Sequence, residues 1–179
     1  MAIVNNINLD AIAREAQAIA ADPSRGRRIN RADLQWHTDP SGPQMTVSAK
    51  YENGEVKVEV DSPTFMGGKG SRPGPLHLCI LGLLSCFTAT FVTAASARGI
   101  HLRSLRATGQ CHLDLGRAFG VSDAPIVQNV TFTIEAETDA PPEEVEAARQ
   151  EAMARCPAIF ALANPIPVTS QVRTVSRVG

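Results

Sequence analysis

The feature that most constrains how this 179-residue chain can fold is a long uncharged run, Leu76–Ala97, interrupted only by His77. By length alone such a run could form a helix that crosses a bilayer. Ser and Thr side chains recur along it, however, and both flanking segments resemble strands of half-covered sheets. We therefore expect no membrane span, but a helix that is buried on nearly every side within a soluble dimer.

Strands are predicted from alternating apolar and polar residues. Met45–Tyr51 and Val56–Val60 both alternate, and Asn53-Gly54 lies between them. An Asn-Gly pair between two such runs is typical of a β-hairpin with one covered face. The same pattern predicts further strands near Leu34–Trp36, Leu105–Leu115 and Val130–Ala136, and a last strand is expected near Val168–Val175.

Helical spacing of apolar residues predicts helices at Leu9–Ala21 and at Pro142–Arg155, with Asp139 as the expected N-cap of the second. One or two further turns are expected at Pro157–Ala163. These elements indicate an α+β fold, with antiparallel sheets packed around two long helices. We expect residues 1–44 to form an arm of one helix and a first strand, and residues 45–179 to form the main domain.

The charge balance excludes some partners. The chain has 17 basic and 18 acidic residues, so it lacks the strong positive field that nucleic acid or an anionic membrane attracts. Asn5, Asn6 and Asn8 interrupt any apolar core of a secretory signal. We therefore expect a cytoplasmic location, no nucleic-acid partner, and four cysteines that are reduced at rest.

The short motifs favour neither a metal nor a cofactor. No Cys-x-x-Cys, Cys-x-x-His or His-x-x-x-His spacing occurs, so a structural zinc site is not expected. The Gly67–Gly70 stretch fits neither nucleotide-binding glycine pattern, which favours a flexible rim or linker over a phosphate cradle. Cys79 and Cys111 are expected to be buried as small apolar residues.

Cys86 and Cys156 are the stronger candidates for chemistry. Cys86 lies in the middle of the apolar run, and Cys156 precedes Pro157 at the break between two helical segments. A helix start can lower the pKa of a thiol. From the residues alone, two buried thiols remain as good an interpretation as a redox pair.

A family resemblance favours the redox pair. The segment from Gly74-Pro75 through Leu78–Cys86, the Arg98–Ile100 stretch at the helix end, and Ala154–Pro157 resemble the OsmC/Ohr family. The similarity extends from about Met45 to Val175. It implies an intertwined homodimer that reduces organic hydroperoxides, with Cys86 as the peroxidatic cysteine, Cys156 as the resolving cysteine, and an external thiol or a lipoyl-type reductant.

The resemblance also implies an apolar wall for the substrate. At one position, however, this sequence departs from the family pattern. Leu76 occupies the position where the family usually carries a glutamate that pairs with an arginine, so His77 or Arg72 would have to substitute. The alternative function is a non-catalytic dimeric module that binds a small lipophilic ligand. The expected wall consists of Leu83, Phe87 and Phe91, with Phe65 and Met66 from the loop.

Overall fold

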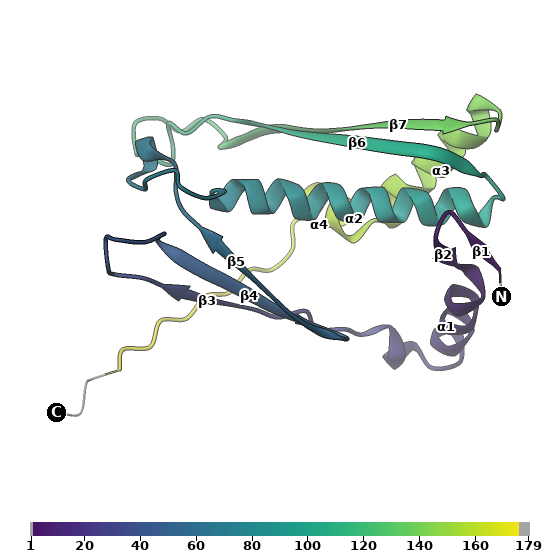
Figure 1. Cartoon of the computed structure of the whole chain (residues 1–179), viewed down its shortest axis with the longest axis horizontal. Helices are drawn as coiled ribbons and strands as arrows, with labels where there is room; N and C mark the ends of the chain where they lie inside the picture. Colours follow the sequence, from purple (N-terminus) through teal and green to yellow (C-terminus); the bar gives the residue numbers. More distant parts are fainter. Residues whose placement is uncertain (1, 176–179) are drawn as a thin grey trace.

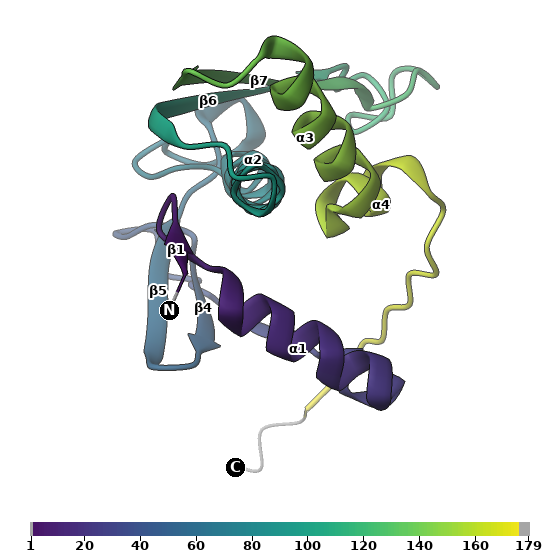
Figure 2. The same ribbon diagram turned by 90° about the vertical axis from the view of Figure 1, so that its right-hand side faces the viewer.

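The apolar run forms a single helix, α2 (Pro75–Ala97), around which the rest of the molecule is arranged (Figure 1). The computed structural model describes residues 2–175. A long antiparallel hairpin of β6 (Leu102–Leu113) and β7 (Val127–Thr138) runs along one side of α2. Figure 2 shows α3 (Pro142–Arg155) and α4 (Pro157–Ala163) beside α2.

On the other side of α2 lies a three-stranded antiparallel sheet in the order β3 (Ala32–Trp36), β4 (Met45–Tyr51), β5 (Gly54–Val60). The hairpin predicted around Asn53-Gly54 is confirmed as β4–β5. Because β3 pairs with β4 along its whole length, the sheet spans the domain boundary expected at residue 44.

The sheet has one apolar and one polar face, as the alternation predicts. Leu34 pairs with Val47, and Val47 pairs with Val58, so these three side chains share a face. The same face carries Trp36, which remains 50% exposed. The apolar side of the sheet is thus covered only in part by its own chain.

The hydrophobic core lies between α2, α3 and the inner face of the β6–β7 hairpin. Ala148 and Ala152 of α3 are fully buried, and such small side chains allow α3 to approach α2 closely. The rings of Phe87 and Phe132 stack with their centroids 5.3 Å apart. The buried cluster consists of Phe87, Phe91, Ala94, Ala95, Ile100, Ala148, Ala152 and Cys156.

The N-terminal arm begins with a hairpin that the sequence did not predict. Two short strands, β1 (Ile3–Val4) and β2 (Ile7–Asn8), are joined through Asn5 and Asn6, whose φ angles are 50° and 65°. Asparagine tolerates this left-handed conformation better than most residues. The predicted helix follows as α1 (Leu9–Ala21), capped by Asn8, and a 3-10 turn, η1 (Pro23–Gly26), leads to β3.

Two predictions about local structure are wrong. The segment Val168–Val175 forms no strand: it lies without regular structure, with Val168 87% and Val172 93% exposed. The N-cap of α3 is Pro141, whereas Asp139 accepts a hydrogen bond from Arg103. The Arg103 guanidinium holds the pKa of the Asp139 carboxyl below its usual range, so this carboxylate serves an ion pair in place of a helix cap.

By length and composition, α2 could cross a membrane, since its most apolar window has a mean hydropathy of 2.0. Only 22% of that window is buried within the protomer. The contacts of α2 with α3, α4 and β6 cover one part of its circumference. Other parts of the helix are open to solvent, where Leu76 is 50% and Leu81 58% exposed.

Candidate functional site

The structure brings Cys86 and Cys156 together. Cys86 lies at the middle of α2, and Cys156 lies at the joint where α3 ends and α4 begins. Their Sγ atoms are 3.6 Å apart, although 70 positions separate them in the chain. A disulfide bond measures about 2.05 Å, so a shift of about 1.5 Å would join the two sulfurs.

The joint between α3 and α4 determines where Cys156 lies. Its N–H donates to the carbonyl oxygen of Ala152 and thereby ends α3, while its own carbonyl accepts the N–H of Phe160 in α4. Pro157 fits the first position of α4 because proline has no N–H to leave unsatisfied there. The Cys156 side chain is 1% exposed, within the core cluster.

Cys86 differs from Cys156 in accessibility. Its side chain is only partly buried, whereas the Cys156 side chain is fully buried. A reagent that diffuses in from solvent would therefore reach Cys86 first. This asymmetry separates the two thiols into an accessible one and an enclosed one.

Burial raises the pKa of the Cys86 thiol above its ordinary value, and the neighbouring Cys156 raises it further. The backbone N–H of Ala158, in the first turn of α4, acts in the opposite direction and lowers the pKa. Sequence reasoning missed Ala158. Its signal is the position directly after Cys-Pro at a helix start, where N–H groups have no partner within the helix.

Neither of the two side chains expected to replace the missing glutamate reaches Cys86 in its own protomer. His77 lies nine positions before Cys86, about 13 Å along the helix axis, and its Nδ1 accepts the N–H of Gly74 at 3.2 Å. The Nε of Arg72 donates to Glu59 at 2.7 Å. Among residues 2–175, Cys156 is the only other side chain that contributes to the shifted pKa of Cys86.

The other two cysteines lie away from this pair. Cys111 is partly buried on β6, as expected. The expected burial of Cys79 is wrong, because Cys79 is exposed on the first turns of α2. Cys79 lies seven positions before Cys86, about 10 Å along the helix axis, and the uncovered side of α2 accounts for its exposure.

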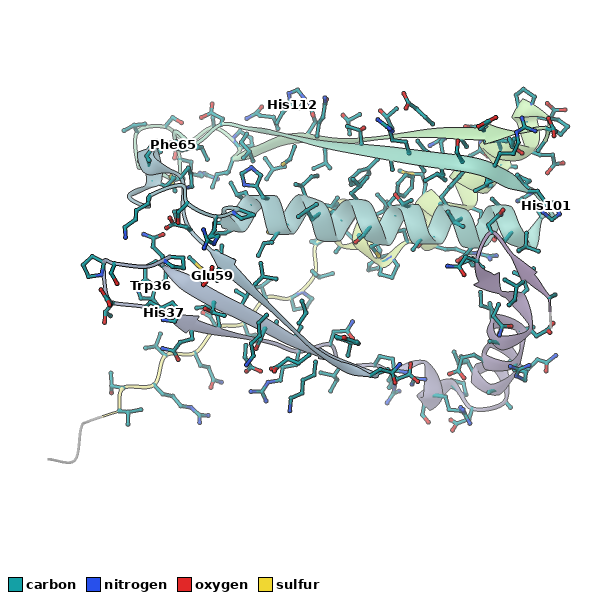
Figure 3. All side chains as sticks on the ribbon, in the orientation of Figure 1. Trp36, His37, Glu59, Phe65, His101 and His112 are labelled. Atoms are coloured by element: carbon teal, nitrogen blue, oxygen red, sulfur yellow. The ribbon has the colours of Figure 1, made fainter. Side chains whose placement is uncertain are left out.

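The aromatic residues expected to line a substrate wall take two different places. Phe87 and Phe91 point into the protomer core, at 3% and 2% exposure. Figure 3 shows Phe65 in the loop that precedes α2, and this loop adjoins the helix start, since Pro63 lies next to Gly74. Cys86 is eleven positions beyond Pro75, about 16 Å along the axis, so Phe65 does not adjoin Cys86 within one protomer.

Two open grooves lie on the side of α2 that faces α3. One of about 450 Å³ is lined by Phe91, Ile134 and Val145, and one of about 560 Å³ by Val130, Met153 and Leu162. The stacked Phe87 and Phe132 rings line both grooves. Neither groove is lined by Cys86 or Cys156.

The glycine-rich stretch at residues 67–70 is not free to cradle a phosphate. The N–H groups of its glycines donate to carbonyl oxygens of residues 62–64. Those of Lys69 and Ser71 donate to the buried carboxylate of Asp61. A phosphate cradle needs several unpaired N–H groups pointing at one anion. In this loop those N–H groups already donate to acceptors within residues 61–64.

No group of three or more His, Cys, Asp or Glu side chains with the geometry of a metal site forms within residues 2–175. The described site consists of two sulfur atoms, one N–H donor and the apolar side chains around them.

Comparisons with known proteins identify relatives of this arrangement. A sequence model of the family described as OsmC-like protein matches residues 68–171, a range that contains both cysteines. No curated protein matches the chain.

Solved structures share the fold. An OsmC-like protein from Mycoplasma pneumoniae is 18% identical, with a TM-score of 0.58 over 76% of this chain and 88% of that one. The organic hydroperoxide resistance protein OsmC from Legionella pneumophila is 20% identical, with a TM-score of 0.54 over 75% and 89%. An organic hydroperoxide resistance protein from Elizabethkingia anophelis is 19% identical, with a TM-score of 0.51 over 75% and 88%. At such identities the likeness concerns the fold.

Proposed function

Because this chain belongs to the OsmC-like protein family, we propose that it reduces organic hydroperoxides at the expense of external thiols, with Cys86 and Cys156 as a redox pair. The observation that carries the proposal is the 3.6 Å distance between the two Sγ atoms. Two thiols placed at random within a domain of this size would rarely lie so close. The names of the solved relatives from Legionella pneumophila and Elizabethkingia anophelis, which concern organic hydroperoxide resistance, supply the substrate class.

The accessible thiol is assigned the first step. The Cys86 thiolate attacks the distal oxygen of the hydroperoxide, the O–O bond breaks, and the alkoxide takes up a proton and leaves as an alcohol. Cys86 is then a sulfenic acid. The Cys156 sulfur attacks it, water leaves, and a disulfide forms between α2 and the α3–α4 joint. A dithiol, such as a lipoyl group, or two small thiols return both sulfurs to the reduced state.

The isolated protomer disfavours ionisation of the Cys86 thiol. Because burial raises the pKa of this thiol, most of it is protonated at neutral pH, and the thiol is a poor nucleophile. The N–H of Ala158 stabilises the thiolate, but the described residues place no cation beside it. In the proposal, any cation that completes the site comes from a second copy of the chain.

We include an intertwined homodimer in the proposal, with α2 and α3 of both copies at its centre. The support is physical. Leu34 and Trp36 on the sheet and Leu76 and Leu81 on α2 are each at least 50% exposed in the protomer. Exposed apolar side chains on both elements are the kind of surface that an interface between copies would cover. Contact with the second copy would also bury the exposed part of α2 without a membrane. We therefore propose a cytoplasmic location for the dimer.

The central experiment follows turnover of cumene hydroperoxide by the wild type and three cysteine variants. Cys86→Ser is expected to abolish turnover, since no nucleophile remains. Cys156→Ser is expected to stop after one turnover and to leave a sulfenic acid on Cys86 that dimedone labels. Cys79→Ser is the matched control on the same helix and should retain activity. Undiminished turnover by Cys86→Ser would remove the peroxidase proposal.

The two grooves beside Phe87 and Phe132 favour one alternative, a dimeric module that binds a small lipophilic molecule without chemistry. The larger groove, about 560 Å³, is within the size range of small-molecule sites. In this case an apolar fluorescent probe such as ANS would bind equally to the wild type and to Cys86→Ser, and neither would consume hydroperoxide.

A further inference from the structure

The larger of the two grooves, of about 560 Å³, is an elongated hollow with apolar walls. One wall is the Val127–Phe132 stretch of β7, and the other comes from α3 and α4, which Figure 2 shows beside α2. Five residue steps along a strand span about 17 Å. Val127, Met153 and Leu162 in these walls are between 42% and 50% exposed. The groove therefore offers an extended apolar surface that the protomer leaves open.

Arg149 is the one charged side chain among the described residues that line this groove. Phe87, Phe132 and Arg149 also line the smaller groove, so they mark the end where the two grooves meet. Nε and Nη2 of Arg149 donate to Glu146 at 2.7 and 2.6 Å. A guanidinium has five N–H donors, and Nη1 donates to no acceptor in the part of the chain that the structure describes. Arg149 thus keeps donors for an anion at one end of the groove.

The ion pair with Glu146 leaves this preference for an anion in place. The Glu146 carboxylate lines only the smaller groove. Its side chain is about half exposed, so water and salt screen its charge. The pair also holds the Arg149 guanidinium in one orientation, and a fixed planar guanidinium binds a carboxylate better than a mobile one.

We propose that the larger groove is a second ligand site, which takes a long-chain carboxylate with its head group at Nη1 of Arg149 and its acyl chain along Met153 and Leu162. Mostly apolar walls with a few polar groups that fix orientation are typical of small-molecule sites. Neither Cys86 nor Cys156 lines the groove, so the ligand is bound there and not converted. The site gives the lipophilic-binding alternative a ligand class, and it does not depend on peroxidase chemistry.

The walls of the groove are connected to the cysteine pair. Phe87 follows Cys86 in α2, and Met153 and Ile159 each lie three positions from Cys156. Closing the two sulfurs from 3.6 Å to a bond would draw the α3–α4 joint towards α2 and narrow the groove at Phe87. The disulfide form should then bind the carboxylate more weakly, and by linkage the bound carboxylate should oppose disulfide formation. This coupling, unlike the site itself, rests on the proposed function.

Fluorescence titration of the reduced full-length protein with 11-(dansylamino)undecanoic acid tests the site. Arg149→Gln is expected to weaken binding at least fivefold, because the carboxylate loses its charged partner. The methyl ester of the same probe should bind the wild type and Arg149→Gln alike. Arg149→Lys keeps the positive charge and should give an intermediate Kd for the acid.

Arg155→Gln is the matched control for Arg149. It removes an arginine that also pairs with a glutamate on α3 but lines neither groove, so the Kd should stay at the wild-type value. At the apolar end, Leu162→Ser should weaken binding of acid and ester alike, at least threefold. Phe160→Ser, on α4 but outside both grooves, should leave both unchanged.

Two results of these titrations would contradict the proposal. An acid Kd that is the same in the wild type and in Arg149→Gln would overturn the carboxylate as ligand class. Absence of probe binding to the wild type, as expected where a second copy of the chain fills the groove, would overturn the site.

The same titration after one equivalent of cumene hydroperoxide tests the coupling, with free thiols counted to verify the disulfide. The acid should bind the oxidised protein at least threefold more weakly, and Cys86→Ser should show no such change. Equal binding in both forms, with the disulfide present, would overturn the coupling and leave the proposed function in place. A disulfide that does not form would overturn the proposed function together with the coupling, and leave the Arg149 site in place.

Discussion

Among single residues, Cys86 carries the greatest chemical demand, because it must be reachable and ionised at once. Its partial exposure meets the first requirement. The second is opposed by burial and by the adjacent Cys156, which both raise the pKa of the thiol. The balance between these effects and the Ala158 N–H sets how much thiolate is present at a given pH.

We predict that alkylation of Cys86 by iodoacetamide, read by mass spectrometry of the Cys86 peptide, continues to accelerate above about pH 8.5, the pKa of an ordinary thiol. A raised pKa places the midpoint of the rate curve on the alkaline side of this value. In Cys156→Ser the contribution of the second thiol is lost, so the midpoint should fall. A midpoint well below that of free N-acetylcysteine in the same buffer would show that a cation stabilises the thiolate in solution.

The elements around the site differ in how far the sequence predicted them. The helix at α2 was predicted from its long uncharged run, and the hairpin β4–β5 from alternating residues on both sides of Asn53-Gly54. The β1–β2 hairpin was missed because its strands have two residues each, too few for periodicity, although Asn5-Asn6 is a turn signal. A strand was also predicted near Val168–Val175, but a strand needs a pairing partner, and none lies beside this segment in the described chain.

The site itself was predicted less directly. Spacing and composition left Cys86 and Cys156 open between burial and chemistry, and the family resemblance favoured the pair. No sequence pattern indicated that His77 would bind the N–H of Gly74 or that Arg72 would pair with Glu59. Such choices depend on loop geometry, which local propensity does not encode.

The close contact between α2 and α3 leads to a prediction about the cysteine pair. Ala152 is 0% exposed, so Ala152→Leu should overpack the contact, destabilise the fold by about 1–3 kcal/mol, and push the α3–α4 joint away from α2. Disulfide formation after addition of one equivalent of hydroperoxide should then slow at least severalfold. Urea unfolding and quantification of free thiols provide the two measurements.

Ala154→Leu is the control for this experiment, because Ala154 lies on the exposed side of the same helix. It adds the same volume without contact to α2 and should leave both the free energy of unfolding and the rate of disulfide formation near wild type. An Ala152→Leu variant that forms the disulfide at the wild-type rate would show that the sulfur distance does not depend on the spacing of α2 and α3.

For the whole molecule, the sequence supplies a single internal reporter of assembly. Trp36 is the only tryptophan and lies on the half-open apolar face of the sheet. We predict that its fluorescence emission shifts to the red on dilution through the dimer Kd, because dissociation exposes the indole to water. An emission maximum that stays constant while sedimentation reports dissociation would exclude this face from the interface.

The enclosure of Cys156, at 1% exposure, determines how the oxidised protein would be reset. An incoming thiolate can touch only the Cys86 half of the bridge, so the mixed adduct with the reductant must form on α2, and Cys156 must serve as the leaving group. The recovery step therefore has a fixed direction, and a reductant captured in mid-reaction should be found attached to one sulfur only.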